Sequence, residues 1–470
     1  MTSKNDTILL DVKDLETEFS TIDGTTKAVD KVSLNLKKEE TLAIVGESGS
    51  GKSVAAMSIL KLIPEPPGKI KGGLITFNGR VLSKYSDKEM RSVRGNDISL
   101  IFQEPMTALN PVLTIGTQIS ETIRRHNSVS KKEASERAIK MLDLVKVPEP
   151  SRRVFQYPHQ LSGGMRQRVM IAIALACNPR VLIADEPTTA LDVTIQAEIL
   201  SLLNRLKRET GCAIIFITHD MAVVSQIADR VIVMFQGKKV EEGTVFDVLE
   251  RPQHSYTKSL LAAVPKLGDM KDKLYPEVIP IKEYKEKKLK PITGQKQNLL
   301  RVKNLTTIFP VTSGIFGKTI ANVRAVEDVS FSIKKGQTFS LVGESGCGKS
   351  TVGRSILRLE KAKRGKVLLE GKDFLKLKKN QLHKLRTNMQ MVFQDPFGSL
   401  NPRQKAGNIV GEMLKVHGVK NYDERLERVH ELFKRVGLNR DHTSNYPHEF
   451  SGGQRQRVAI ARALALNPKL

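Results

Sequence analysis

The chain has 470 residues, of which 40% are hydrophobic and 27% charged, and its net charge is +26. This composition is typical of a soluble globular protein. No run reaches the ~18 apolar residues that a membrane-spanning helix needs, and the first ten residues lack the features of a signal peptide. The three cysteines, Cys177, Cys212 and Cys347, have neither paired nor metal-ligand spacing, so we expect a reduced, cytoplasmic chain without disulfides or structural zinc.

Short apolar runs alternate with helix-type patterns along the first half of the chain. Residues 41–45, 181–185 and 213–218 are apolar runs that predict buried strands, and residues 54–62 have the spacing of a helix. Alternation of this kind favours a mainly parallel sheet covered by helices, which is an α/β fold.

The second half restates the first, so the repeat predicts two domains. We expect a first domain over residues 1–264, a linker over 265–298 and a second domain over 299–470. The linker is rich in lysine and contains Pro265, Pro276, Pro280 and Pro291, which indicates a solvated segment. Lysines are scattered along the chain and many fall in this linker, so a general basic bias explains the net charge at least as well as a phosphate-binding surface does.

Each half contains a glycine-rich loop of the form G-x-x-x-x-G-K-S. The glycines let backbone N–H groups surround phosphates, the lysine reaches the outer phosphates, and the serine hydroxyl can ligate Mg²⁺. The helix that follows directs its positive end at the same anion. We expect ATP and Mg²⁺ to bind at Gly46, Glu47, Ser48, Gly49, Ser50, Gly51, Lys52 and Ser53, and at Gly343, Glu344, Ser345, Gly346, Cys347, Gly348, Lys349, Ser350 and Thr351.

Two carboxylates and a histidine follow the predicted strands of the first half. Asp185 ends the run 181–185 and is placed to hold the magnesium ion, and Glu186 is then the general base for the attacking water. His219 follows the run 213–218 and can contact the terminal phosphate, although a lone histidine is as often structural.

These motifs resemble those of ABC-transporter ATPases, notably the signature at 161–164 (LSGG) and the run 185–192 (DEPTTALD). The resemblance covers nearly the whole first half. It assigns Gln103 to the glutamine loop, with a role in both metal binding and catalysis. It also assigns Asp192 to a dimer contact and Phe19 to stacking on adenine. It implies further ATP contacts at Ser162, Gly163 and Gly164, and in the second half at Gln394, Ser451, Gly452 and Gly453, with Phe309 as the second stacking residue.

Within that family the chain resembles the peptide-importer branch. The run 251–260 (RPQHSYTKSL) is similar to the tail element of oligopeptide and dipeptide importers, and two fused units are typical of the ATPase subunit of bacterial glutathione importers. The resemblance implies an ATPase that powers the import of short peptides, glutathione among them. Its partners would be two membrane-spanning permease subunits and an extracytoplasmic binding protein. The chain would lie on the cytoplasmic face of the bacterial inner membrane.

The second half lacks an acidic strand. Asp185 lies 23 residues after Ser162 (185 − 162), and the matching position after Ser451 would be 474 (451 + 23), beyond Leu470. We therefore expect a second unit that is incomplete at its C-terminus and poorly folded alone, because a central strand would lose its neighbour.

In this family two units pair head to tail, within one chain or between copies, and each ATP lies between one P-loop and the other unit's signature. The resemblance implies one complete site, made of Lys52, Ser53, Gln103, Asp185, Glu186 and His219 with Ser451, Gly452 and Gly453. The other would join Lys349 and Ser350 to Ser162, Gly163 and Gly164, without base, magnesium aspartate or histidine.

Two other functions remain open at this point. The charge of +26 suggests a soluble twin ATPase that acts on ribosomes or nucleic acid. The four linker prolines argue against it, because related translation factors join their units by a continuous helix, so we expect no nucleic-acid partner. The remaining alternative is a truncated, non-functional remnant.

Overall fold

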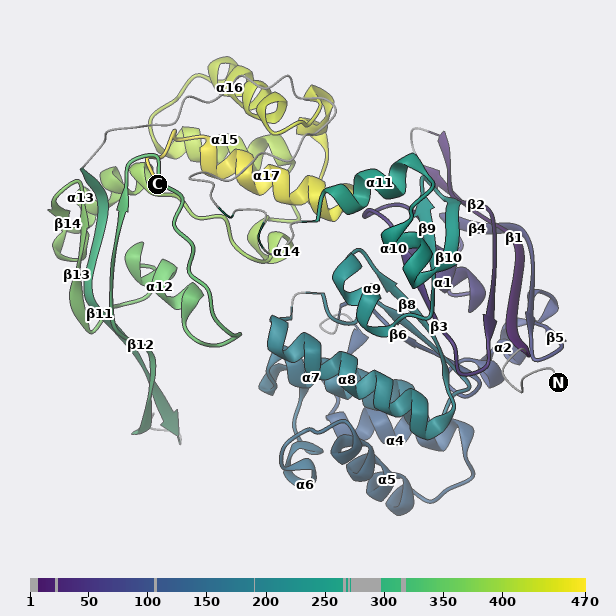
Figure 1. Ribbon diagram of the computed structural model, residues 1–470. Coiled ribbons are helices and arrows are strands. Elements are labelled where there is room, and N and C mark those ends of the chain that lie inside the picture. The colour runs from purple at the N-terminus through teal and green to yellow at the C-terminus, as the bar shows by residue number, and fades with distance from the viewer. Residues whose placement is uncertain are drawn as a thin grey trace. The chain divides into compact units, whose positions relative to one another are not determined.

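The computed structural model describes residues 7–21, 24–104, 108–189, 191–264, 297–313 and 318–470, together with Gly268 and Lys271. The chain divides into two compact units, Met1–Tyr284 and Lys285–Leu470 (Figure 1). Apart from Gly268, Lys271 and residues 297–298, the predicted linker over 265–298 lies outside the described residues.

The first unit is built on a six-stranded sheet with the order β10-β9-β3-β8-β7-β6. All neighbours are parallel except β9 and β10. Strands β3, β7 and β8 are buried throughout, as expected for parallel strands covered on both faces. The prediction of a mainly parallel sheet is therefore confirmed. The strands are β3 (Thr41–Val45), β6 (Ile98–Ile101), β7 (Val181–Asp185), β8 (Ala213–Thr218), β9 (Arg230–Phe235) and β10 (Lys238–Thr244).

An antiparallel sheet of order β2-β1-β4-β5 shares one apolar core with the parallel sheet and helix α1. A second core lies under the helices on the other side of the parallel sheet. The antiparallel strands are β1 (Ile8–Thr21), β2 (Gly24–Lys37), β4 (Gly68–Phe77) and β5 (Arg80–Val81). The helices are α1 (Lys52–Ile59), α2 (Asp87–Val93), α4 (Ile115–His126), α5 (Lys131–Leu144), α6 (Pro150–Arg153), α7 (Gly163–Leu175), α8 (Val193–Thr210), α9 (Met221–Ile227), α10 (Val245–Glu250) and α11 (Ser255–Ala262), with short 3-10 turns at Leu82–Lys84 and Pro158–Gln160.

The sheet order explains why distant motifs meet. Strand β8 pairs with β3 on one side and β7 on the other, in parallel. The carboxyl ends of parallel strands lie at the same edge of a sheet, which is where α/β proteins bind ligands. The P-loop after β3, the carboxylates at the end of β7 and His219 after β8 therefore share one edge.

The second unit contains an antiparallel sheet of order β12-β11-β13-β14 and a separate group of helices, each with its own apolar core. The strands are β11 (Asn298–Ser313), β12 (Lys318–Lys334), β13 (Arg364–Leu369) and β14 (Lys372–Asp373). The helices are α12 (Lys349–Ile356), α13 (Lys379–Leu385), α14 (Pro396–Ser399), α15 (Ala406–Val416), α16 (Tyr422–Arg435) and α17 (Gly452–Leu464), and 3-10 turns lie at Phe374–Lys376, Arg386–Asn388, Arg440–Ser444 and Pro447–Glu449.

The run before the second P-loop differs from its counterpart in the first unit. Residues 338–342 (TFSLV) match β3 (TLAIV), yet they form no strand and all five are exposed, whereas all five residues of β3 are buried. In the first unit β3 is held by β8 and β9. Residues 299–470 contain no sequence counterpart of those two strands, so the apolar run has no partner to pair with.

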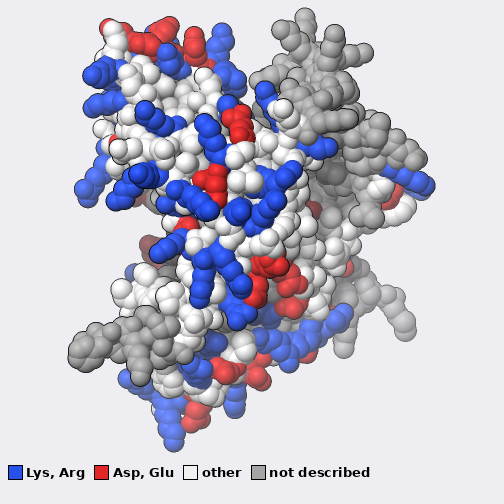
Figure 2. Space-filling model, turned by 90° about the vertical axis from the view of Figure 1, so that its left-hand side faces the viewer, with Lys and Arg blue, Asp and Glu red and all other residues white. Residues whose placement is uncertain are grey.

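The outer face of the second unit's antiparallel sheet is basic. Exposed Arg301 and Lys303 on β11 alternate with a buried valine, and Lys303 lies directly opposite exposed Lys366 on β13. In the first unit the matching face carries Asp11, which pairs with Lys13 at 3.5 Å. Figure 2 shows one side of the molecule, where Lys and Arg side chains spread over much of the surface and Asp and Glu side chains lie in smaller groups between them. At these matching positions the second sheet is therefore more basic than the first.

Candidate nucleotide site

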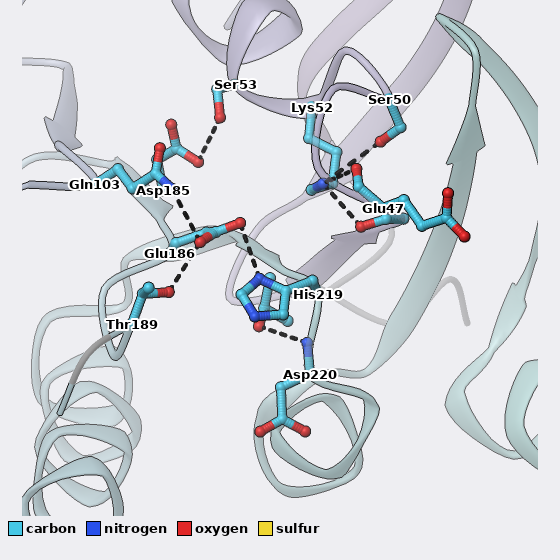
Figure 3. Close-up of polar contacts among 12 residues, drawn as sticks. Glu47, Ser50, Lys52, Ser53, Gln103, Asp185, Glu186, Thr189, His219 and Asp220 are labelled. Atoms are coloured by element: carbon cyan, nitrogen blue, oxygen red, sulfur yellow. Dashed lines mark hydrogen bonds and ion pairs between the residues drawn. The ribbon is translucent and has the colours of Figure 1, made fainter. Parts of the chain in front are cut away.

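The P-loop of the first unit is closely packed around the side chain of Lys52, which is only 4% exposed. Its Nζ donates to the carbonyl oxygens of Gly46 at 2.8 Å and Glu47 at 2.7 Å, and contacts Ser50 Oγ at 3.4 Å (Figure 3). A Cβ atom on Gly46, whose φ is +152°, would lie 2.2 Å from a backbone oxygen of β9. Glycine is thus required for the loop to turn this tightly.

This loop fits a phosphate ligand. Burial lowers the pKa of Lys52, and the carboxylates of Glu186 and Asp185 act in the opposite direction. The ammonium group is held by neutral carbonyl oxygens, with no carboxylate bonded to it among the described contacts. A buried ammonium group of this kind gains most from a strong anionic acceptor, and phosphate is the anion that this loop geometry suits.

A carboxylate and a hydroxyl group converge beside the start of α1. Ser53 Oγ donates to Asp185 Oδ1 at 2.9 Å, and Asp185 is 6% exposed. Mg²⁺ in phosphate sites is held by one or two protein oxygens together with phosphate oxygens, so this pair fits the ion. No group of three His, Cys, Asp or Glu that could hold a metal occurs in the described part of the chain.

Glu186 is the centre of the hydrogen-bond network at this edge (Figure 3). Its Oε2 accepts from Gln103 Nε2 at 3.0 Å and from Thr189 Oγ1 at 2.9 Å, and its Oε1 lies 3.0 Å from His219 Nδ1. The residue has a φ of +46° and is anchored by its N–H, which donates to the Ile217 carbonyl at 2.9 Å. Three segments of the chain therefore fix both oxygens of this carboxylate.

The charge state of the network follows from these bonds. Burial opposes ionisation of Glu186, but the bonds from His219 and Thr189 outweigh it and lower the pKa of the carboxyl group. The bond to Glu186 raises the pKa of His219. Because an ionised carboxylate only accepts, Nδ1 of His219 carries a proton, and its Nε2 remains available for a ligand.

Asp185 is expected to lower the stability of the chain at neutral pH when neither nucleotide nor Mg²⁺ is bound. Burial raises the pKa of Asp185 from 3.8 to about 6, so ionising this carboxyl group costs more in the folded state than in the unfolded state. The resulting destabilisation is complete above pH 6 and shrinks as the pH falls toward 4. Asp185→Asn keeps the bond from Ser53 and should stabilise the nucleotide-free, Mg²⁺-free chain at pH 7.5 by about 1–3 kcal/mol. Thermal unfolding at pH 7.5 and 4.5 measures this, and the gain should shrink at the lower pH.

Asp143→Asn, which changes an exposed residue of α5, is the matched control and should leave the unfolding temperature unchanged. If the Asp185→Asn variant is less stable than wild type at pH 7.5, the buried Asp185 carboxylate does not destabilise the folded chain.

The second P-loop has the same local contacts in a more open setting. Lys349 Nζ donates to the Gly343 and Glu344 carbonyls, each at 2.6 Å, and lies 3.7 Å from Cys347 Sγ. The residues from Gly343 to Cys347 are exposed, as is Gln394. No residue between 299 and 470 matches Asp185, Glu186 or His219 in sequence. The network around Glu186 therefore has no copy in this unit's described residues.

The signature serines cap helices. Ser162 Oγ accepts from the Met165 N–H at the start of α7, and Ser451 Oγ accepts from the Gln454 N–H at the start of α17. Gly163, Gly452 and Gly453 have open space where a Cβ would lie, whereas Gly164 faces Ile195. Among the described contacts, Ser162 makes no hydrogen bond to the P-loop of its own unit.

The remaining predicted residues lie apart from the network. Asp192 caps α8 by accepting from the Ile195 N–H at 3.0 Å. Phe19 lies in β1 opposite Thr26 and Gly68, and Phe309 lies in β11 opposite Val323. Their roles in dimer contact and adenine stacking stay predictions.

Comparison with known proteins agrees with this geometry. A family model described as "ABC transporter" matches residues 29–189 and 326–470, and one described as "Oligopeptide/dipeptide transporter, C-terminal region" matches residues 240–294. The chain belongs to the ABC transporter family, as one of its ATP-binding, ATPase subunits. The expected fold class, a pair of tandem cassettes, is confirmed.

Its relatives include glutathione import proteins. The glutathione import ATP-binding protein GsiA of Escherichia coli O157:H7 is 51% identical over 98% of this chain and 76% of the relative. GsiA of Salmonella paratyphi A is 51% identical over 94% of this chain and 73% of the relative. A solved dimeric cassette, MJ0796 bound to ADP and Pi, is 30% identical with a TM-score of 0.46, covering 50% of this chain and 99% of the other. No described helix is both long and apolar enough to cross a bilayer.

Sequence patterns missed two contacts of the site. Thr189 belongs to the quoted run 185–192, but only the structure shows its hydroxyl on Glu186. Tyr256 belongs to the quoted tail run 251–260, and the structure places its hydroxyl on the P-loop. A threonine three residues after the base was a usable signal, since the spacing suits a local turn, whereas no local pattern connects Tyr256 with Glu47.

Proposed function

We propose that the chain hydrolyses ATP to drive the import of short peptides, with glutathione as the favoured substrate. The observation that carries the ATPase part is the fixed carboxylate of Glu186, bonded to Gln103, Thr189 and His219 beside the P-loop. The substrate is supported by the relatives named as glutathione importers and by the match of residues 240–294 to a peptide-transporter region.

In this proposal the P-loop binds the phosphates of ATP, and Lys52 exchanges the Gly46 and Glu47 carbonyls for phosphate oxygens. Ser53 and Asp185 would hold Mg²⁺, which neutralises phosphate charge when it is bound. Glu186 takes a proton from the attacking water, since its ionised oxygens are fixed in position and only accept. His219 directs Nε2 toward the terminal phosphate. Its raised pKa favours the protonated, positively charged imidazole, which attracts the negative phosphate.

The import reaction requires partners that this chain does not contain. The proposal includes two membrane-spanning permease subunits, a substrate-binding protein outside the membrane, and a location on the cytoplasmic face of the inner membrane. ATP-driven pairing of a P-loop with the signature of another unit would transmit motion to the permease. The similarity to import subunits favours this function over an ATPase that acts on nucleic acid or a non-functional remnant.

Uptake by cells that carry the gene tests the proposal. Deleting the gene should abolish the energy-dependent uptake of radiolabelled glutathione, and restoring the wild-type gene, but not Glu186→Gln, should recover it. Uptake of a free amino acid serves as the control and should not change. Glutathione and short-peptide uptake that are equal with and without the gene would refute the import function.

A further inference from the structure

We infer that Tyr256 on α11 is a positioning residue for nucleotide binding, because it holds the peptide unit that docks Lys52. The inference rests on the proposed ATP site and assigns to it a residue outside the P-loop. The Tyr256 hydroxyl accepts a hydrogen bond from the Glu47 N–H at 2.9 Å.

The geometry of one peptide group links Tyr256 to Lys52. The Glu47 N–H belongs to the same planar unit as the Gly46 carbonyl, which accepts from Lys52 Nζ at 2.8 Å. In a trans peptide the N–H and C=O point in opposite directions, so fixing one fixes the other. Gly46 has a φ of +152° and no Cβ, so its backbone is less restrained than that of other residues and gains more from a bond that fixes the following peptide plane. Tyr256 therefore restrains the same peptide plane whose carbonyl accepts from the ammonium group of Lys52.

Tyr256 is itself held firmly. Its ring packs on Phe235 at the end of β9, with centroids 4.2 Å apart. Leu260, Leu261 and Val264 anchor the same helix on an apolar core that also contains β3 residues Ala43 and Val45. The tail segment is thus fastened to the strand that leads into the P-loop.

The start of α11 is fixed by polar bonds. The Glu241 carboxylate on β10 accepts from the Gln253 N–H at 2.7 Å and from the His254 N–H at 3.1 Å. His254 then caps the helix, because its Nδ1 accepts from the Tyr256 N–H at 3.2 Å. These bonds limit the movement of the tyrosine, so its hydroxyl acts as a fixed acceptor for the loop.

The second unit shows the loop without this support. Residues 299–470 contain no counterpart of β10 or α11, and none of β7, β8 or β9, and there the loop from Gly343 to Cys347 is exposed throughout. Lys349 still donates to the Gly343 and Glu344 carbonyls, so we expect Tyr256 to affect how firmly the loop is held rather than which contacts the lysine makes. Lys349 is also more exposed than Lys52. The tail that matches the peptide-transporter region thus contacts the P-loop of the first unit through Tyr256.

The test is the affinity of the full chain for a fluorescent ATP analogue, with steady-state hydrolysis in parallel. All variants carry Lys349→Ala, so that binding reports the first P-loop. Tyr256→Phe removes only the hydroxyl and keeps the ring against Phe235. We expect its Kd and KM for nucleotide to rise about three- to tenfold, the range for losing one hydrogen bond, with kcat within about twofold. Tyr85→Phe, elsewhere in the same unit, is the control and should match the parent.

The outcomes separate this inference from the proposed function. Nucleotide binding that is lost in Lys52→Ala but unchanged in Tyr256→Phe overturns the inference and leaves the ATP site standing. A lower kcat with unchanged KM also overturns it, because a positioning role in binding predicts the reverse. A parent chain that binds no nucleotide would instead refute the ATP site itself.

Discussion

Glu186→Gln is expected to slow ATP hydrolysis by about 10²–10³-fold while ATP affinity stays within about threefold. The amide keeps the size of the side chain, and its oxygen can still accept from Gln103 and Thr189, but its NH2 group replaces the acceptor that faces His219, and it cannot accept the proton of the attacking water. Single-turnover phosphate release and equilibrium binding of ATP, measured on the same preparation, separate the chemical step from binding.

Glu198→Gln is the matched control for this replacement. Glu198 lies on α8 and pairs with Arg168 outside the network. Its hydrolysis rate should equal that of wild type. If the Glu186→Gln variant hydrolyses ATP at the wild-type rate, Glu186 is not the general base. If both variants lose the same fraction of the hydrolysis rate, the loss reflects a general effect of removing a negative charge.

Lys52→Ala and Lys349→Ala are expected to differ sharply although the two lysines have the same local contacts. Lys52→Ala should lower hydrolysis by about 100-fold or more, because a charge-assisted contact to the phosphates is lost beside Asp185 and Glu186. Lys349→Ala should change hydrolysis by less than about threefold, since residues 299–470 supply no counterpart of those two carboxylates. Phosphate release by the 470-residue chain measures both.

Each variant serves as the control for the other, because both remove a lysine from the same motif. Thermal unfolding should confirm that both chains remain folded. Equal losses of hydrolysis would contradict the asymmetry and would mean that the second P-loop takes part in turnover as much as the first.

The parallel sheet could be predicted because its signals are local. The runs at β3, β7 and β8 are apolar and short, and each is followed at once by residues with recognisable chemistry: the P-loop, Asp185 with Glu186, and His219. Adjacent parallel strands then bring these residues to one edge without further information. The motif spacing predicts phosphate contact for Lys52 and Mg²⁺ ligation for Ser53, whereas the contacts of Lys52 with the Gly46 and Glu47 carbonyls are seen only in the structure.

Other features depend on contacts between distant residues and could not be predicted in this way. Residues 338–342 have the composition of β3 but no strand to pair with, so composition alone does not produce a strand. The bond between Tyr256 and Glu47 joins residues 209 positions apart. The raised pKa of Asp185 arises from burial, which only the packed structure reveals.

A crystal structure of the Glu186→Gln chain with ATP and Mg²⁺ tests the central claim most directly, namely that the first unit contains an assembled ATP-hydrolysing site. The account predicts ATP on the first P-loop, Lys52 moved from the Gly46 and Glu47 carbonyls to phosphate oxygens, and Mg²⁺ between Ser53, Asp185 and the phosphates. A structure in which ATP is absent from this loop, or in which Lys52 keeps its carbonyl contacts while Asp185 remains apart from the metal, would contradict the account.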